Sequence, residues 1–180
     1  MELNSYLSEI FRQMSWADAA VWQSVLKTPG AEEDDSIQRM LYHMHATQHA
    51  FLSLWEDRPL EIPEPTSFPD LISIAKWAHA FHKEASEFIG GADEKELSRL
   101  VVLPWTYLVE EKLGKKPGEV TLEGSMLQVA LHSSHHRGQI NARVRVLGGE
   151  PPLIDFIGWL WFEKPLADWD FIYSLQNKEV

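Results

Sequence analysis

The 180 residues of this chain are 44% hydrophobic and 24% charged, a composition typical of one globular domain that buries a continuous core. We therefore expect a single domain over residues 1–180. The formal net charge of -11 makes binding to a phosphate backbone unfavourable, so we expect no nucleic-acid partner. The chain has no cysteine, which excludes disulfides, thiolate metal ligands and a thiol nucleophile of its own.

No apolar run approaches the roughly 20 residues that span a bilayer, and residues 1–13 include acidic and polar side chains where a signal peptide needs an unbroken apolar stretch. We expect a soluble, cytoplasmic protein with no membrane partner.

Four segments show the three- and four-residue spacing of apolar side chains that is typical of amphipathic helices. We expect them over residues 3–26, from Asp35 or Ser36 to Arg58-Pro59, over 70–89, and from Thr121 to Gly148-Gly149. The four prolines within 59–69 predict a crossing loop, and residues 99–118 favour a short extended excursion or hairpin. The apolar segment 153–162 predicts a last short helix or a strand-like cap. The fold class is therefore all-α, a helical bundle.

Two histidines, His132 and His136, lie four residues apart in the fourth predicted helix. At 100° per residue they project about 40° apart, next to the apolar positions Val129 and Ile140. Cβ atoms at this spacing are about 5–6 Å apart, which allows two imidazoles to reach one ion. Arg143 falls on the same stripe, where we expect an acidic partner or a neighbouring subunit.

In the second predicted helix the same projection places His43 beside Met40, Phe51 and Leu54, and places His45 and His49 about 200° and 240° away. We therefore expect His43 to face the core while His45 and His49 face water. Surface or supporting roles are expected for five histidines: His45, His49, His79, His82 and His135.

Each inward histidine taken alone is typical of a core residue with a hydrogen-bond partner. Three together favour another explanation, because one cation would satisfy all three lone pairs and offset the cost of burying them. The sequence predicts a divalent metal site of His43, His132 and His136 with an open coordination position. Imidazole suits several metals, and we expect zinc or nickel first and iron next.

The run HSSHHRGQI at 132–140, followed by LGG at 147–149 and PP at 151–152 with Asp155, resembles the DinB family. Two further segments agree with the family pattern: MSWAD at 14–18 and LYH at 41–43. The chain departs from that pattern by having Asp18 where the family usually has asparagine, and by an enlarged excursion at 105–118.

The resemblance implies an antiparallel four-helix bundle with one long crossover, a three-histidine site at one end of the bundle, and a homodimer. It implies no DNA-binding surface. Some relatives are thiol S-transferases or isomerases, so we expect a metal-dependent enzyme of the thiol S-transferase or hydrolase kind. Its partners would be a small-molecule substrate and a low-molecular-weight thiol.

Two alternatives remain open at this point. The first is a non-catalytic bundle whose metal only ties helices together, since no acid or base can be placed beside the ion from spacing alone. The candidates for such a group are Asp18, Tyr42, Gln48 and Glu123. The second alternative is a scaffold that binds a partner through the tryptophan-rich segment 159–169.

Overall fold

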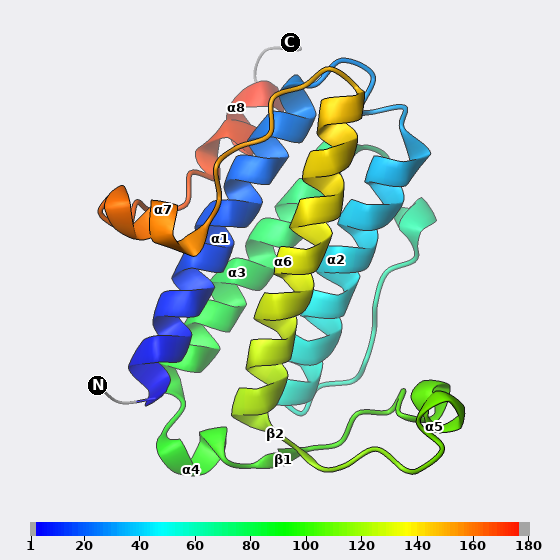
Figure 1. Cartoon of the computed structure of the whole chain (residues 1–180), viewed down its shortest axis with the longest axis vertical. Helices are drawn as coiled ribbons and strands as arrows, with labels where there is room; N and C mark the ends of the chain where they lie inside the picture. The colour runs from blue at the N-terminus through cyan, green and yellow to red at the C-terminus, as the bar shows by residue number, and fades with distance from the viewer. Residues whose placement is uncertain (1–2, 177–180) are drawn as a thin grey trace.

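Four long helices lie side by side in the computed structural model, which describes residues 3–176 (Figure 1). They are α1 (Leu3–Lys27), α2 (Asp35–Trp55), α3 (Leu71–Gly91) and α6 (Leu122–Val146). Helix α1 packs against α3 and α6, and α2 packs against the same two helices. The four helices expected from the sequence are confirmed to within a few residues at each end.

The long connection between α2 and α3 determines the relative directions of the four helices. In Figure 1, α1 and α6 run in one direction, and α2 and α3 in the other. The proline-rich segment, which includes the 3-10 turn η1 (Pro65–Ser67), returns along the outside of the bundle from the end of α2 to the start of α3. The expected all-α bundle with one long crossover is confirmed.

Capping residues explain where several of the long helices begin or end. Asp34, one residue before the predicted start, caps α2 by accepting a hydrogen bond of 2.9 Å from the backbone N of Ile37. Asp70 and Ser73 form a capping box at the start of α3. Gly148, at φ +82°, follows α6 at the predicted stop. Each cap satisfies backbone groups that the helix end would otherwise leave without a partner.

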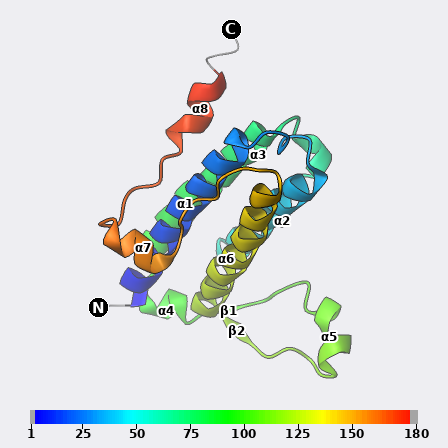
Figure 2. The same cartoon turned by 45° about the horizontal axis from the view of Figure 1, so that its top comes forward.

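The predicted excursion is an antiparallel two-stranded stem, β1 (Leu100–Val101) with β2 (Val120–Thr121), whose loop contains the short helix α5 (Tyr107–Leu113). Figure 2 shows this loop standing away from the four long helices. It follows α4 (Glu94–Leu97). The hairpin expectation is confirmed, and α5 was not expected.

The chain ends in two short helices, α7 (Phe156–Trp161) and α8 (Asp170–Gln176), connected by an irregular segment. Helix α7 confirms the helical alternative for 153–162, whereas α8 was not expected. The ends of the predicted domain, 1–2 and 177–180, lie outside the described residues, as do the side chains of Leu3, Leu175 and Gln176. Within 3–176, no helix combines the length and the apolar character that crossing a bilayer requires.

A layer of polar side chains divides the core into two apolar clusters. One cluster includes Trp22, Leu41 and Ile140, and the other includes Phe11, Trp55 and Met126. Between them along each helix lie six buried polar residues: Asp18 of α1, His45 and Gln48 of α2, His82 of α3, and Ser133 and Arg137 of α6. This polar layer lies halfway along the bundle, at the same height as the predicted ligands His43, His132 and His136.

Candidate metal centre

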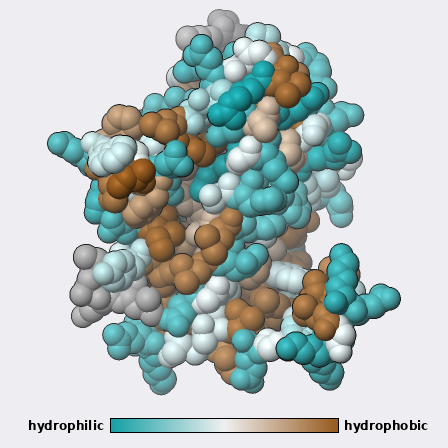
Figure 3. Space-filling view, viewed as in Figure 1, coloured by the Kyte–Doolittle hydropathy of each residue, from teal (hydrophilic) through white to brown (hydrophobic). Residues whose placement is uncertain are grey.

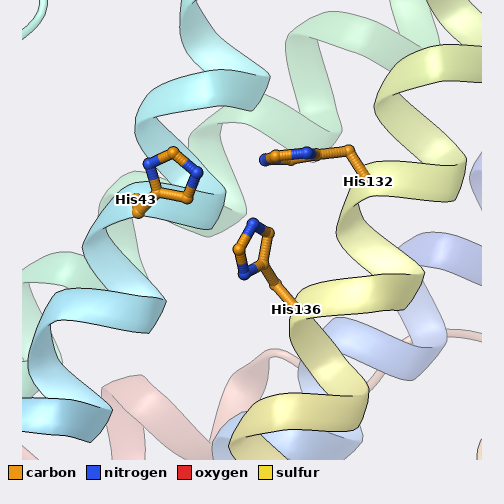
Figure 4. Close-up of side chains that lie close together, drawn as sticks. All are labelled: His43, His132 and His136. Carbon is orange, nitrogen blue, oxygen red and sulfur yellow. The ribbon is translucent and has the colours of Figure 1, made fainter.

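The structure brings the three predicted ligands together on one side of the bundle. His43 projects from α2, and His132 and His136 project from successive turns of α6, so that the three rings point toward one another (Figure 4). One ring nitrogen from each residue lies within 4.8 Å of the other two. The ring centroids are 4.4 to 5.2 Å apart and the ring planes cross at 61° to 75°. This is the convergence that coordination of one ion requires.

The expected burial of this cluster was wrong. His43 is exposed, and His132 and His136 are only half-buried. The buried side of α2 is centred on residues such as Leu41 and Gln48, roughly 130° from His43 at 100° per residue. Met40 and Leu54, which lie in the apolar arc predicted from the sequence, are only half-buried. The three histidines therefore lie at the outer edge of the seam between α2 and α6, and solvent can reach them.

The position along the bundle also differs from what the resemblance implied. His132 and His136 lie near the middle of α6, level with the buried polar residues Ser133 and Arg137 of the same helix. The cluster is therefore halfway along the bundle rather than at one end.

The nitrogen atoms of the cluster fit a metal ion. Nε2 of His132 is buried and has no hydrogen-bond partner, although such atoms in proteins nearly always have one. Burial lowers the pKa of His132 to about 4, with smaller contributions from His136 and His43, and burial likewise lowers the pKa of His136. Both rings therefore carry a free lone pair at neutral pH. A divalent cation would supply the partner that His132 lacks.

Gln139 orients one of the three rings. Its Oε1 lies 2.8 Å from Nδ1 of His136 and accepts the hydrogen of that nitrogen. The tautomer fixed in this way leaves the lone pair of His136 on Nε2, the other side of the ring. Gln139 is thus a supporting residue that the sequence argument did not assign.

The expectation that His45 faces water was wrong. His45 is fully buried, with Nε2 accepting from Trp22 Nε1 at 2.9 Å and Nδ1 donating to Gln48 Oε1 at 2.7 Å. His82 was also expected outside the core, yet it is 7% exposed and donates to Asp18 Oδ2 at 2.9 Å. Both histidines belong to the buried polar layer, a role that was not predicted from the sequence.

Asp18 is the centre of that layer. Its Oδ1 accepts from Arg137 at 2.6 Å, and its Oδ2 accepts from Gln48 at 2.9 Å and from His82. Burial alone would raise the pKa of Asp18, but Arg137 and His82 hold that pKa well below its usual range. A signal existed in the sequence, because Asp18 follows Met14 and precedes Val21 on the apolar stripe of α1, where a charge needs a buried partner.

The other expectations have mixed outcomes. His135 is exposed, as expected, and His79 contacts Trp169 and the Tyr173 hydroxyl near the surface. His49 is half-buried and stacks on Trp77. Arg143 forms an ion pair with Asp34, which confirms the expected acidic partner.

The candidate acids and bases lie elsewhere. Asp18 and Gln48 are engaged in the polar layer, and the Tyr42 hydroxyl donates to the carbonyl O of Pro63 at 2.8 Å. Glu123 lies two and a half turns from His132 along α6, about 13 Å by the helical rise. The arrangement therefore offers ligands and an open side, with none of these four groups beside the rings.

Fold and site together define a class: helical bundles with a cluster of histidines, able to hold a metal ion, on the seam between two helices. The family model of the DinB family matches residues 7–170, nearly the whole chain, and the protein therefore belongs to the DinB family. The resemblance drawn from the histidine motif is confirmed. Comparison with curated proteins and comparison with solved structures gave no match.

Proposed function

We propose that the protein binds one divalent metal ion through His43, His132 and His136 and acts as a metal-dependent enzyme on a small molecule. The observation that carries the proposal is the convergence of three ring nitrogens within 4.8 Å, one of them buried without a partner. Zinc or nickel is the preferred ion, with iron next, because neutral imidazole suits these metals.

The reaction would be hydrolysis or transfer of a substrate group to a thiol. A divalent ion held by three neutral ligands keeps its full charge, and it would supply a Lewis acid that lowers the pKa of a water or thiol presented to it. Because the chain has no cysteine, the thiol would come from a low-molecular-weight cosubstrate. The exposed side of His43 leaves room for both to approach.

The protein's own residues position the ligands. Gln139 holds the tautomer of His136 from one side. Ser133 and Arg137, which directly follow the two ligands along α6, attach the adjacent, buried side of that helix to Gln48 and Asp18 in the core. The two ligands of α6 are therefore held by a rigid element, which a preorganised metal site needs.

The first experiment measures metal content by inductively coupled plasma mass spectrometry after reconstitution with zinc and with nickel. We expect near one ion per chain in the wild type and a loss of the ion in His43→Ala, His132→Ala and His136→Ala. His135→Ala is the matched control, since His135 is an exposed histidine next to the cluster. Folded wild type that retains no metal would overturn the proposal.

A second experiment separates an enzyme from a metal that only ties helices together. The absence of the four candidate acids and bases from the vicinity of the rings favours that alternative. Zinc-loaded protein is tested with chloro-dinitrobenzene and common cellular thiols, and with activated esters for hydrolysis. Turnover that disappears in His132→Ala supports the enzyme. A metal-loaded protein inert toward every combination supports the structural alternative.

We also propose a homodimer. Three large apolar side chains of α6, α7 and the segment between them are open to solvent: Leu131 at 69%, Leu153 at 59% and Trp161 at 76%. Exposed apolar side chains that form a contiguous patch typically mark an interface. Light scattering should give the mass of two chains for the wild type and of one for Trp161→Glu. A monomeric wild type would favour the alternative of a scaffold for another partner.

A further inference from the structure

A cavity of about 920 Å³ opens directly beside the histidine cluster, between α2, α6 and the 100–121 excursion. His132 is one of its lining residues, so the cavity and the cluster are continuous. We call this cavity the seam pocket. Its volume lies within the range of small-molecule binding sites, about 300–1,000 Å³.

Small residues form the floor of the seam pocket. Ala46 and Ala50 of α2 line it, and so does Gly124 of α6. Gln128 and Gly124 precede His132 by one and two turns, and α2 runs the opposite way on the other side of the seam. The pocket thus extends from the cluster for two helical turns, about 11 Å, toward the excursion.

Apolar side chains form the walls. Those contributed by the crossover and the excursion include Leu60, Ile62, Val102, Leu103, Trp105 and Val109. Trp105 packs edge to face against Phe51 of α2, with ring centroids 5.2 Å apart. Val102 is 84% exposed and Val109 is 42% exposed, and Figure 3 shows brown, apolar side chains over the excursion. These side chains are exposed to solvent, so an apolar ligand that covers them would bind favourably by removing apolar surface from water.

The polar groups of the seam pocket offer little to a charged ligand. The hydroxyls of Thr47 and Ser125 donate to the backbone carbonyls of His43 and Leu122. Among the described lining residues, Glu119 is the one side chain with a full charge. A ligand with a negative group on its body would find no cation along the walls, apart from a metal at the histidine end.

We propose that the seam pocket binds the alkyl or aryl body of the substrate, while a single metal-ligating head group of the same molecule reaches the histidine cluster. This inference rests on the proposed metal site and names the substrate class for it. A molecule with an apolar body and one head fits the pocket, and a molecule with further anionic groups on its body does not.

The test uses straight-chain hydroxamic acids, from acetyl to octanoyl, titrated into zinc-loaded protein by calorimetry. Because each buried methylene contributes about 0.8 kcal/mol, we expect Kd to fall about fourfold per added methylene until the chain fills the pocket. Succinic monohydroxamic acid, similar in length to the pentanoyl compound, should bind at least about tenfold more weakly. A Kd that does not change with chain length in zinc-loaded protein overturns the inference and leaves the metal site standing.

Two variants locate the effect. Ala50→Trp fills the floor and Val109→Asp places a charge in the exposed wall, and both should abolish the dependence on chain length while acetohydroxamic acid binds as before. Ala142→Leu, on the exposed side of α6 outside the pocket, is the matched control and should behave like the wild type. Circular dichroism checks that each variant folds. Because Val109 is exposed, we expect Val109→Asp to fold even if Ala50→Trp does not.

If the protein retains no zinc, the proposed metal-dependent function is overturned, and the pocket is then tested separately in metal-free protein. Straight-chain amides of the same lengths are then titrated into metal-free protein, with the fluorescence of Trp105 and its neighbours as the signal. Affinity that rises with chain length and is lost in Val109→Asp supports the pocket. Equal affinities along the series overturn it.

Discussion

Two groups of histidines lie at the same level of the bundle in opposite environments. His45 and His82 are in the core and have hydrogen-bond partners there: Trp22 and Gln48 bind the first, and Asp18 binds the second. His43, His132 and His136 lie at the edge of the α2–α6 seam, and Nε2 of His132 has no partner at all. His45 and His82 thus hydrogen bond to groups of the protein, whereas Nε2 of His132 is buried and available for an added ligand.

This difference separates stability from function. The buried network around Asp18 joins all four long helices, although Nε of Arg137 has no partner, and removing one of its members leaves another buried polar or charged group unpaired. A half-exposed cluster with lone pairs to spare contributes little to folding but is ready to bind a cation. We therefore expect changes in the core group to act on the free energy of unfolding, and changes in the edge group to act on metal affinity.

The largest effect is expected for Asp18→Leu. It leaves the Arg137 guanidinium, which is 4% exposed, without its counter-ion, and removing one partner of a buried pair costs about 3–5 kcal/mol. Urea unfolding of metal-free protein measures this loss. The double variant Asp18→Leu/Arg137→Met should recover more than half of it, since no charge is left alone. His43→Ala, at the edge, should cost less than about 1 kcal/mol. Equal losses in Asp18→Leu and His43→Ala would contradict the division between the two groups.

The next largest effect is a pH dependence carried by His45. Burial lowers the pKa of His45 to about 4, against the attraction of Asp18, while the unfolded chain has a histidine pKa of about 6.5. Between these values the unfolded state binds a proton that the folded state does not. The free energy of unfolding should therefore fall as the pH decreases from 7 to 4, by about 3 kcal/mol from this residue.

Urea unfolding of metal-free protein at a series of pH values checks this expectation. His45→Gln should remove most of the slope, and His132→Ala should remove less, because its ring is half-buried and solvent weakens the effect. A slope that is unchanged in His45→Gln would place the titration elsewhere.

Part of the fold and of the histidine site could be predicted from the sequence. The four helices and the crossover followed from apolar spacing and proline placement, because these local signals have one simple structural solution. The identity of the three clustered histidines also followed, since the four-residue spacing of His132 and His136 is fixed by the helix itself. His43 was added by a helical projection that placed it in the core, and the family motif agreed with this choice.

The environment of each histidine could not be predicted in the same way. A helical projection gives relative angles, but the direction of the core depends on which helices pack on each side. His43 and His45 exchanged roles because Met40 and Leu54 were taken as core residues, whereas Leu41 and Met44 are. The partner of Asp18 is 119 residues away in the chain, so only the packing of α1 against α6 identifies it.

The smallest effect, and the sharpest test of the edge group, is expected for Gln139→Ala. The substitution removes the acceptor for Nδ1–H of His136 and leaves the ring free to rotate or change tautomer. Loss of such an outer partner typically weakens metal binding about 10–100-fold, and we expect the lower end because the 139 side chain is exposed. Competition with a zinc chelator measures the affinity. Gln139→Glu, which keeps an acceptor oxygen, should restore it, and the unfolding free energy of the metal-free protein should change by less than about 0.5 kcal/mol in both. A Gln139→Ala protein that binds zinc as tightly as the wild type would show that the His136 tautomer is set by the ion alone.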